Sequence, residues 1–406
     1  MRLSGNLEEG RYPMHVLILG TRGIPSKHSG FETFAQDLAL FLRARDHKVT
    51  VYCQVSKGEH FREDEWNGIR RVLIPARDGS IGTIIFDWLA IRHSMRERGV
   101  VLTLGYNTGI FNALYRLRGL SNLMNMDGIE WRRGKWSRLA RAWFWFNEWA
   151  GARVATHLIA DHPEIGKHLL RHTSPGKITV IPYGADLVSS APVDLINRYG
   201  LMAKEYYLLI ARPEPENSIL EIVRAYSFQR RGMPLVVLGK YSRDGTSYQN
   251  KVLDAAGPEI KFLGAIFERD VVRALRFHAR AYMHGHRVGG TNPSLVESLG
   301  AGNAVIAHDN PFNRWVAGEG ARYFQSPDDL AEILESLDTD CTQLLGMEEA
   351  SRRRHRESFI QGKVLGAYEE LLLRFSPKDA AFLAPKQSAS APEDDLSMSA
   401  DRGSVR

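Results

Sequence analysis

Short apolar runs alternate with stretches of helix length along the whole chain. Runs such as HVLILG (15–20) and PLVVLG (234–239) are typical of strands that are buried on both faces of a sheet. The helical segments between such runs predict repeated βαβ units and therefore parallel sheets. The predicted strands of the first half are 15–20, 49–53, 70–75, 100–104, 122–126, 157–161 and 178–182, and those of the second half are 206–211, 234–239, 260–264, 280–285, 304–308 and 321–324.

Two such series in succession predict an α/β fold with two Rossmann-like domains. The length of 406 residues agrees, because one hydrophobic core seldom organises so long a chain. The break falls near 183–204, where YGADLVSSAPVD supplies loop residues. We expect one domain at 14–183, a second at 204–358, a closing helix at 359–375, and a disordered tail at 376–406 that is rich in Ser, Ala, Pro, Asp and Lys.

The composition is that of an ordinary globular protein, with 44% hydrophobic and 25% charged residues. No apolar run approaches the roughly 18 residues of a spanning helix, and the opening MRLSGNLEEGRYP lacks the apolar core of a signal peptide. Since the only cysteines are Cys53 and Cys341, we expect no disulfide framework and a cytoplasmic location. The net charge of +6 suits an anionic substrate or a membrane surface. The chain lacks a recognition-helix, zinc-finger or RNP-like pattern, which argues against nucleic acid.

The first predicted strand leads into a glycine-rich turn, GTRGIP (20–25), which GFETF (30–34) follows. Glycines at the carboxyl end of a first parallel strand let the backbone turn sharply and approach a ligand. The spacing is not G-x-G-x-x-G, which argues against a dinucleotide. The turn is either structural or, given Arg22 and Glu32, also a contact to substrate.

A second polar segment follows the predicted strand 122–126 and contains Asp127, Glu130 and Trp131. Carboxylates hydrogen-bond sugar hydroxyls in pairs, and an indole face stacks on a pyranose ring. Asp127 is also a candidate base or charge stabiliser. The alternative is a solvated loop that Trp131 anchors by packing.

Large apolar residues recur at helical spacing within 131–155, with Arg and Lys between them; they are Trp136, Leu139, Trp143, Phe146 and Ala150. One interpretation is an amphipathic helix whose apolar face packs on the core. The other is a basic aromatic face that rests on an anionic membrane.

In the second half, Arg212 ends the predicted strand 206–211. An arginine at the carboxyl end of a strand is placed to bind a diphosphate through paired, charge-assisted hydrogen bonds. The alternative is an ion pair with Glu214 or Glu216.

The richest segment, 284–302, is predicted to form strand, glycine loop and helix. Asn292 is a good N-cap, Pro293 suits the first helical position, and Gly289 and Gly290 leave backbone N–H groups uncovered. A helix N-terminus with free N–H groups is an anion site, here for phosphate. Glu297 lies one turn into the helix, where it could accept hydrogen bonds from both hydroxyls of a ribose.

Two histidines open this segment, His284 and His286. Their spacing is compatible with a metal site, but a third and a fourth ligand are missing from the pattern. We therefore expect no metal here.

These motifs resemble those of the retaining GT-B glycosyltransferases of family four, and within that family a bacterial subgroup that includes capsule and exopolysaccharide rhamnosyltransferases. The resemblance covers most of residues 14–375. It rests on GTRGIP (20–25), GFETF (30–34), HKVTVYC (47–53), MDGIEW (126–131), IPYGAD (181–186), ARPEPEN (211–217) and HGHRVGGTNPSLVESLGAGNAVIAHDNPFNR (284–314). It implies two facing Rossmann-like domains with an interdomain cleft, the C-terminal one holding the nucleotide sugar and the N-terminal one the acceptor.

The resemblance also implies residue roles, with Glu297 on the ribose and Arg212 on the diphosphate. The predicted donor-binding residues are Arg212, His286, Gly289, Gly290, Thr291, Asn292, Ser294 and Glu297. The predicted acceptor-binding residues are Arg22, Glu32, Glu130 and Trp131, and the predicted catalytic residues are Asp127, Arg212 and Glu297.

Three positions depart from the family pattern. Gly289 stands where the first Glu of the E-x7-E motif contacts the donor sugar. Asn217 stands where a Lys usually follows the Arg, which leaves the diphosphate charge to Arg212, helix N-termini and Arg287. A catalytic His is not evident in the first half, and Asp127 lies near its place.

We therefore expect an enzyme, a retaining hexosyltransferase that moves a sugar, with rhamnose as the leading guess, from a nucleotide diphosphate sugar to a saccharide. The acceptor is expected to be lipid-linked, in exopolysaccharide, capsule or O-antigen synthesis, at the inner face of the cell membrane. No cofactor and no metal is expected, because Arg and backbone dipoles take the metal's place. The alternatives are a nucleotide-sugar epimerase of GT-B fold and a catalytically silent scaffold.

Overall fold

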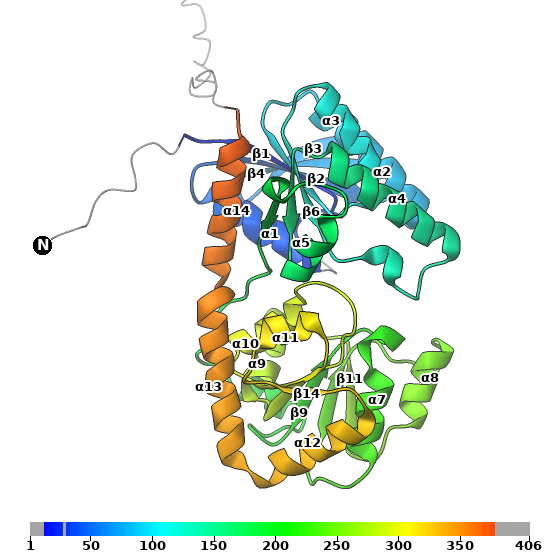
Figure 1. Ribbon diagram of the computed structural model, residues 1–406, viewed down its shortest axis with the longest axis vertical. Coiled ribbons are helices and arrows are strands. Elements are labelled where there is room, and N and C mark those ends of the chain that lie inside the picture. The colour runs from blue at the N-terminus through cyan, green and yellow to red at the C-terminus, as the bar shows by residue number, and fades with distance from the viewer. Residues whose placement is uncertain (1–11, 27–29, 378–406) are drawn as a thin grey trace, which may run out of the picture.

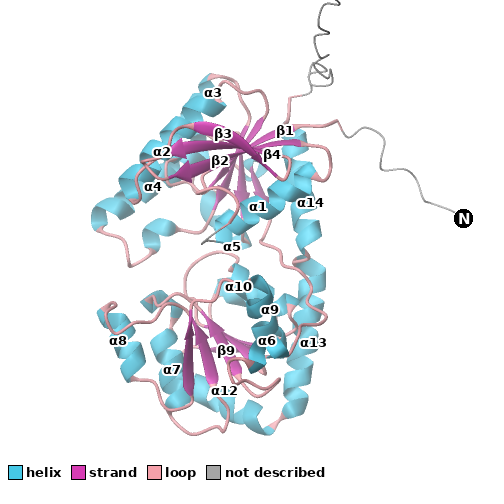
Figure 2. Cartoon of the chain, turned by 180° about the vertical axis from the view of Figure 1, so that it is seen from behind, coloured by secondary structure: helices cyan, strands magenta, loops and turns pink. Residues whose placement is uncertain are grey.

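The computed structural model describes residues 12–26 and 30–377, and within them the chain forms two sheets. The strands of the first sheet are β1 (His15–Leu19), β2 (Lys48–Val55), β3 (Arg62–Trp66), β4 (Ile69–Pro75), β5 (Val100–Leu104), β6 (Asn122–Met126), β7 (His157–Ala160) and β8 (Ile178–Val180). Those of the second sheet are β9 (Tyr207–Ile210), β10 (Leu235–Leu238), β11 (Ile260–Gly264), β12 (Ala281–His284), β13 (Ala304–His308) and β14 (Arg322–Phe324). Each sheet is the centre of one lobe, and the two lobes are stacked along the long axis of the molecule (Figure 1, Figure 2).

Every apolar run that we predicted as a strand forms one, and the sheets are parallel as expected. The order is β3-β4-β2-β1-β5-β6-β7-β8 in the first sheet and β11-β10-β9-β12-β13-β14 in the second. The apolar pattern missed β3, which pairs antiparallel with β4 at the edge of the first sheet. Its sequence REDEW has no apolar run because it is held partly by charge, with Arg70 and Arg71 of β4 bonding Glu63 and Asp64.

Helices cover both faces of the first sheet, so its central strands are buried on both sides, whereas the edge strands β3 and β8 are not. These elements are α1 (Gly30–Arg43), α2 (Ser80–Ser94), η1 (Gly109–Asn112), α3 (Ala113–Leu117), η2 (Glu130–Arg132), α4 (Arg138–Val154), α5 (Pro163–Leu169) and η3 (Pro175–Lys177). Alternate residues of β1 face opposite sides: Val16 and Ile18 pack with α1, whereas Leu17 and Leu19 pack with α2. This alternation accounts for the unbroken apolar runs in the sequence.

The second sheet is covered in the same way. Its elements are α6 (Asp194–Asn197), η4 (Pro215–Asn217), α7 (Ile219–Ser227), α8 (Ser247–Asp254), α9 (Arg269–His278), α10 (Pro293–Gly300), α11 (Pro311–Ala317), α12 (Pro327–Thr339) and α13 (Cys341–Ser358). The chain then returns to the first lobe through α14 (Gln361–Phe375), whose Tyr368 and Leu372 lie in the core of that lobe. Glu369 of α14 bonds His47 at 2.9 Å.

The chain crosses between the lobes at two neighbouring points. The backbone N–H of Ala185 donates to Phe359 at 2.9 Å, and that of Gln361 donates to Ala185 at 3.1 Å. Within the described residues, the chain links the two lobes covalently only at these two crossings, which lie next to each other. The predicted tail at 376–406 lies outside the described residues except for its first two positions.

The helix predicted within 131–155 exists as α4, and its predicted apolar stripe is divided between core and surface, because Ala150 is buried whereas Leu139 and Phe146 are exposed. Leu139 is 85% exposed and Phe146 is 39% exposed. The buried face of α4 is instead made of small and polar residues, Asn147, Glu148, Ala150, Gly151 and Ala152. Helical spacing alone could not reveal this, because a stripe that faces solvent has the same period as one that faces the core.

Candidate active site

The predicted site residues of both lobes meet where the carboxyl ends of the two sheets approach each other. Asp127 follows β6, and the glycine loop of the second lobe follows β12. A methyl group added at Gly128 would lie 3.8 Å from the Cα of Gly289 and 3.9 Å from the nitrogen of Gly290. The segments 126–131 and 284–297, which are far apart in the sequence, are therefore in direct apposition.

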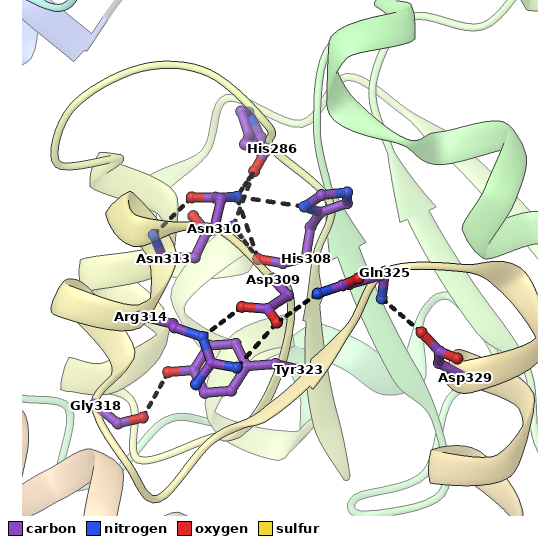
Figure 3. Close-up of polar contacts among 10 residues, drawn as sticks. All are labelled: His286, His308, Asp309, Asn310, Asn313, Arg314, Gly318, Tyr323, Gln325 and Asp329. Carbon is purple, nitrogen blue, oxygen red and sulfur yellow. Dashed lines mark hydrogen bonds and ion pairs between the residues drawn. The ribbon is translucent and has the colours of Figure 1, made fainter.

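The start of α10 forms as the sequence predicts. The side chain of Asn292 accepts a hydrogen bond from the N–H of Ser294 at 3.0 Å, and Pro293 occupies the first turn. The preceding loop is held from α11, because Asn310 and Asn313 both donate to the carbonyl oxygen of His286, at 3.0 and 2.8 Å (Figure 3). The loop is thus fixed in front of a helix N-terminus, the arrangement that an anion site requires.

Asp161, directly after β7, joins the two lobes at this loop. Its carboxylate accepts a hydrogen bond from the N–H of Thr291 at 2.9 Å, and its carbonyl oxygen accepts one from the Thr291 hydroxyl. Asp161 is 1% exposed, and its other carboxylate oxygen has no partner among the described residues. Burial, followed by the charge of Asp127, raises the pKa of Asp161 well above its ordinary value. A side chain at Gly290 would overlap this carboxylate, which explains why a glycine occupies this position.

Asp127 is partly buried beside charged groups of both lobes. Burial and the neighbouring Glu130 raise its pKa to about 6, against the opposing effect of Arg133 and Arg212. No described residue donates a hydrogen bond to its carboxylate, so the group is available to a substrate. A carboxylate with a pKa near the working pH is suited to proton transfer or to charge stabilisation.

The predicted acceptor residues Glu130 and Trp131 are held in place by hydrogen bonds. Trp136 donates to Glu130 at 3.1 Å, and the backbone N–H of Glu130 donates to Tyr106 at 2.7 Å. The indole N–H of Trp131 donates to Glu148 of α4 at 2.9 Å. The other oxygen of Glu148 bonds two histidines, His168 at 2.7 Å and His172 at 3.2 Å. The indole is therefore fixed in position rather than solvated on a free loop.

The other two predicted acceptor residues lie at the glycine turn after β1. Side chains at Gly20 and Gly23, which have φ values of 85° and 109°, would overlap Leu104 and Cys53. Packing alone thus explains these glycines. Arg22 is exposed and Glu32 is 5% exposed in the first turn of α1, and their contact to an acceptor stays a prediction.

Arg212 is exposed at the end of β9 and makes no ion pair within the described residues, so the alternative of a pair with Glu214 or Glu216 is wrong. Glu216 is instead 3.6 Å from Arg133 of the opposite lobe. Arg287, the other cation that we considered for a diphosphate, is bound to Ser218 at 2.7 Å and to Glu221 at 2.9 Å.

Glu297 is 43% exposed at its side chain and is held by a residue that the sequence did not point to. Arg276 of α9, whose side chain is 9% exposed, forms an ion pair with Glu297 and donates to the hydroxyl of Ser294 at 3.0 Å. Tyr282 bonds the same hydroxyl at 2.8 Å. The Ser294 hydroxyl therefore points to Arg276 and Tyr282, and Arg276 fixes the rotamer of Glu297 before any ligand binds.

The two histidines stack on each other, with ring centroids 4.4 Å apart. His284 is fully buried and lies on β12, and burial lowers its pKa well below the ordinary value. Burial, Arg133 and Arg212 lower the pKa of His286 to about 3, so this ring is neutral at physiological pH. A neutral imidazole can still donate one hydrogen bond to a ligand.

Sequence reasoning missed Asp161 and Arg276. Asp161 closed a predicted strand at its carboxyl end, where ligands gather, so a signal was present. Arg276 sits within an ordinary helix, and no local pattern distinguishes it.

One family profile and several solved structures are similar to this chain. The profile of a protein family described as "Domain of unknown function (DUF1972)" matches residues 13–186. No curated protein matches the chain.

Several solved structures share the fold. Sucrose-phosphate synthase from Thermosynechococcus elongatus has a TM-score of 0.73 and is 16% identical, over 88% of this chain and 98% of its own. Anabaena HepE in complex with UDP-glucose has a TM-score of 0.71 and is 14% identical, over 88% and 99%. A structure described as trehalose-6-phosphate from E. coli bound with UDP-2-fluoro glucose has a TM-score of 0.69 and is 11% identical, over 89% and 99%. The chain thus has the α/β fold of the GT-B glycosyltransferases, with two Rossmann-like sheets.

Proposed function

We propose that the protein is a retaining glycosyltransferase that moves a sugar from a nucleotide diphosphate sugar to a saccharide hydroxyl. The observation that carries the proposal is the apposition of the capped N-terminus of α10 and the exposed Arg212 with the carboxylate of Asp127 across the lobes. One side offers positive charge to a diphosphate, and the other offers a carboxylate to the sugar or the acceptor.

In the proposed reaction the bond between the anomeric carbon and the diphosphate oxygen breaks, and the acceptor oxygen bonds to the same face of that carbon. The acceptor proton passes to the leaving phosphate. Arg212 and the N–H groups at the start of α10 stabilise the negative charge that grows on the diphosphate. The proposal includes no metal ion and no cofactor, because protein cations and backbone dipoles take their place. The ionised Asp127 stabilises positive charge on the sugar ring.

A 6-deoxy sugar such as rhamnose is our leading donor. Such a sugar needs fewer polar partners, which agrees with Gly289 at a position where the resembling family has a carboxylate. UDP-glucose belongs in the same screen, because it is the ligand of Anabaena HepE.

The decisive experiment incubates the protein with dTDP-rhamnose, UDP-glucose and related donors, with and without membranes that carry lipid-linked saccharides. Nucleotide release that depends on the acceptor is the expected result. Isomerisation of the donor without an acceptor would instead identify an epimerase. Absence of turnover with every donor would favour a scaffold.

The first prediction concerns Glu297. Replacing it by Ala is expected to weaken donor binding by about 1–3 kcal/mol, because two hydrogen bonds to the ribose are lost. Arg276→Met is expected to act in the same direction by releasing the Glu297 side chain. Titration with the nucleoside diphosphate measures both effects. Unchanged affinity in Glu297→Ala would remove this residue from the site.

We further propose that the acceptor is lipid-linked and that the enzyme works at the inner face of the cell membrane, in exopolysaccharide, capsule or O-antigen synthesis. No helix among the described residues has the length and apolarity to cross a bilayer. The contact would therefore be peripheral, through the α2–α4 surface, which we define by its exposed apolar residues Ile81, Ile85, Trp88, Leu89, Leu139, Trp145, Phe146 and Trp149. The two helices lie side by side in the first lobe (Figure 1, Figure 2).

The charges of this surface match an anionic bilayer. The only acids of α2, α3 and α4 are Asp87 and Glu148, and both are buried. The same helices carry exposed arginines, namely Arg92, Arg116, Arg138, Arg141 and Arg153. Aromatic side chains among exposed cations are the composition that binds anionic lipid surfaces.

The second prediction follows from this surface. Trp145→Ser combined with Phe146→Ser is expected to weaken binding to phosphatidylglycerol vesicles about tenfold or more, because two large apolar side chains no longer enter the lipid. Turnover with a water-soluble acceptor should not change. The control is Phe228→Ser, which removes an aromatic that is 81% exposed on the other lobe. Equal vesicle binding by both variants would contradict the membrane contact.

A further inference from the structure

The second lobe offers too little positive charge for a diphosphate. Close to the start of α10 it has three arginines, and two of them are already paired, Arg276 with Glu297 and Arg287 with Glu221. Asn217 is 4% exposed, and its amide donates to the carbonyl oxygen of Arg212 at 2.9 Å, so it shapes the turn. Arg212 is left as one unpaired cation for a group that carries at least two negative charges.

The opposite lobe brings further cations to the same place. Arg133, after β6 and η2, lies 3.6 Å from Glu216, which is only four residues beyond Arg212. Its side chain is 19% exposed, and it lies 3.2 Å from Glu130 of its own lobe. Both distances are measured from its Nε atom, and no described residue accepts a hydrogen bond from its terminal amino groups. Arg133 is thus ion-paired through Nε, whereas Arg276 and Arg287 are paired through a terminal amino group, so the bidentate edge of the Arg133 guanidinium has no hydrogen-bond partner among the described residues.

Arg133 and Arg212 are close enough to affect the pKa of two other groups, His286 and Lys135. After burial, Arg133 and Arg212 are the groups that lower the pKa of His286, which lies in the loop before α10. Burial together with the same two arginines lowers the pKa of Lys135. Arg133 and Arg212 thus act on His286 from both lobes, and Lys135 lies within electrostatic reach of both arginines. Like charges repel at such proximity, and a bound polyanion relieves that repulsion.

We propose that Arg133, with Lys135 beside it, supplies the second cation of the diphosphate subsite from the lobe opposite to Arg212. The assignment rests on the proposed function and makes it more specific. Glu130 and Glu216 hold the Nε of Arg133 while its terminal amino groups face the phosphates. The donor site is then complete only when the lobes are together, so that donor binding favours closure and excludes water from the reaction.

The test compares ligands that differ by one phosphate. UDP and dTDP, with UMP and dTMP as their partners, are titrated into the wild-type protein, Arg133→Met and Arg133→Lys. We expect Arg133→Met to weaken diphosphate binding about tenfold or more and monophosphate binding much less, since a charge-assisted contact to the second phosphate is lost. Arg133→Lys should retain part of the affinity, because it keeps the charge but not the bidentate geometry.

Arg132→Met is the matched control. It removes one positive charge from the same loop, and Arg132 lies over the ring of Trp131 at 5.2 Å and forms no ion pair within the described residues. Its diphosphate affinity should stay within about twofold of the wild type. Equal diphosphate binding by Arg133→Met and wild type would overturn the assignment of Arg133 alone. A wild-type protein that binds neither diphosphate would overturn the proposed function, and the subsite with it.

Discussion

Asp127→Asn is expected to lower the turnover number about 100-fold or more while donor affinity changes by less than about threefold. The substitution keeps the size of the side chain but removes the negative charge to which we assign stabilisation of the reacting sugar. Since that charge acts mainly in the transition state, its loss lowers kcat rather than binding. Steady-state kinetics with the donor that the proposed screen selects measure kcat and KM separately. A variant that loses donor affinity in equal measure would assign Asp127 to binding instead.

The pH dependence gives a second readout of the same residue. Burial and Glu130 raise the pKa of Asp127 to about 6, so the ionised, active form is present above that pH and is lost as the pH falls through it. The wild-type rate should therefore fall below about pH 6, and this limb should be absent in Asp127→Asn. Asp78→Asn, at an exposed acid of the same lobe, should leave both the rate and the profile unchanged.

The folding stability of the protein should depend on pH in the opposite way to the rate, so that it falls as the pH rises. The folded-state pKa of Asp127 lies above its ordinary value of 3.8, so its contribution to stability is fully present below about pH 4 and is lost as the pH rises through 6. Asn cannot ionise. Asp127→Asn should therefore raise the melting temperature at pH 7.5 and have little effect at pH 4, as expected where a buried ionised carboxylate lowers stability.

The strands and the glycine loop could be predicted because their causes are local. A strand buried on both faces must be apolar throughout, and a cap at Asn292 needs only its own side chain and the next two residues. The edge strand β3 was not predicted, since a strand at an exposed edge needs no apolar run. The orientation of α4 escaped because period does not define which side of a helix faces solvent.

The contacts between lobes could not be predicted from local patterns. Asp161 and Thr291 are 130 residues apart, and the sequence around each carries no pattern that indicates contact with the other. From the sequence, Gly289 replaces a Glu of the resembling family, and Gly290 only leaves a backbone N–H uncovered. The structure gives Gly290 a steric reason, because a side chain there would overlap Asp161, whereas a side chain at Gly289 would meet no atom within 4 Å.

Gly290→Ala is accordingly expected to lower kcat/KM about tenfold to 100-fold, which is the second of the two largest effects. The new methyl group would overlap both carboxylate oxygens of Asp161. That carboxylate is short, buried and bonded to the N–H of Thr291 at 2.9 Å, so it has little room to move. Either the lobes separate or the Asp161–Thr291 contact breaks, and in both cases Asp127 is displaced from the donor loop.

A double mutant separates this steric effect from a general loss of folding. Asp161→Ala removes the overlapping atoms, so Gly290→Ala combined with Asp161→Ala should be more active than Gly290→Ala alone, a non-additivity that is expected of two positions in contact. Gly366→Ala, where nothing lies within 4 Å of the new methyl group, is the control and should retain full activity. If Gly290→Ala also lowers the activity of Asp161→Ala, overlap with the Asp161 carboxylate does not explain the loss, and Gly290 matters within its own loop.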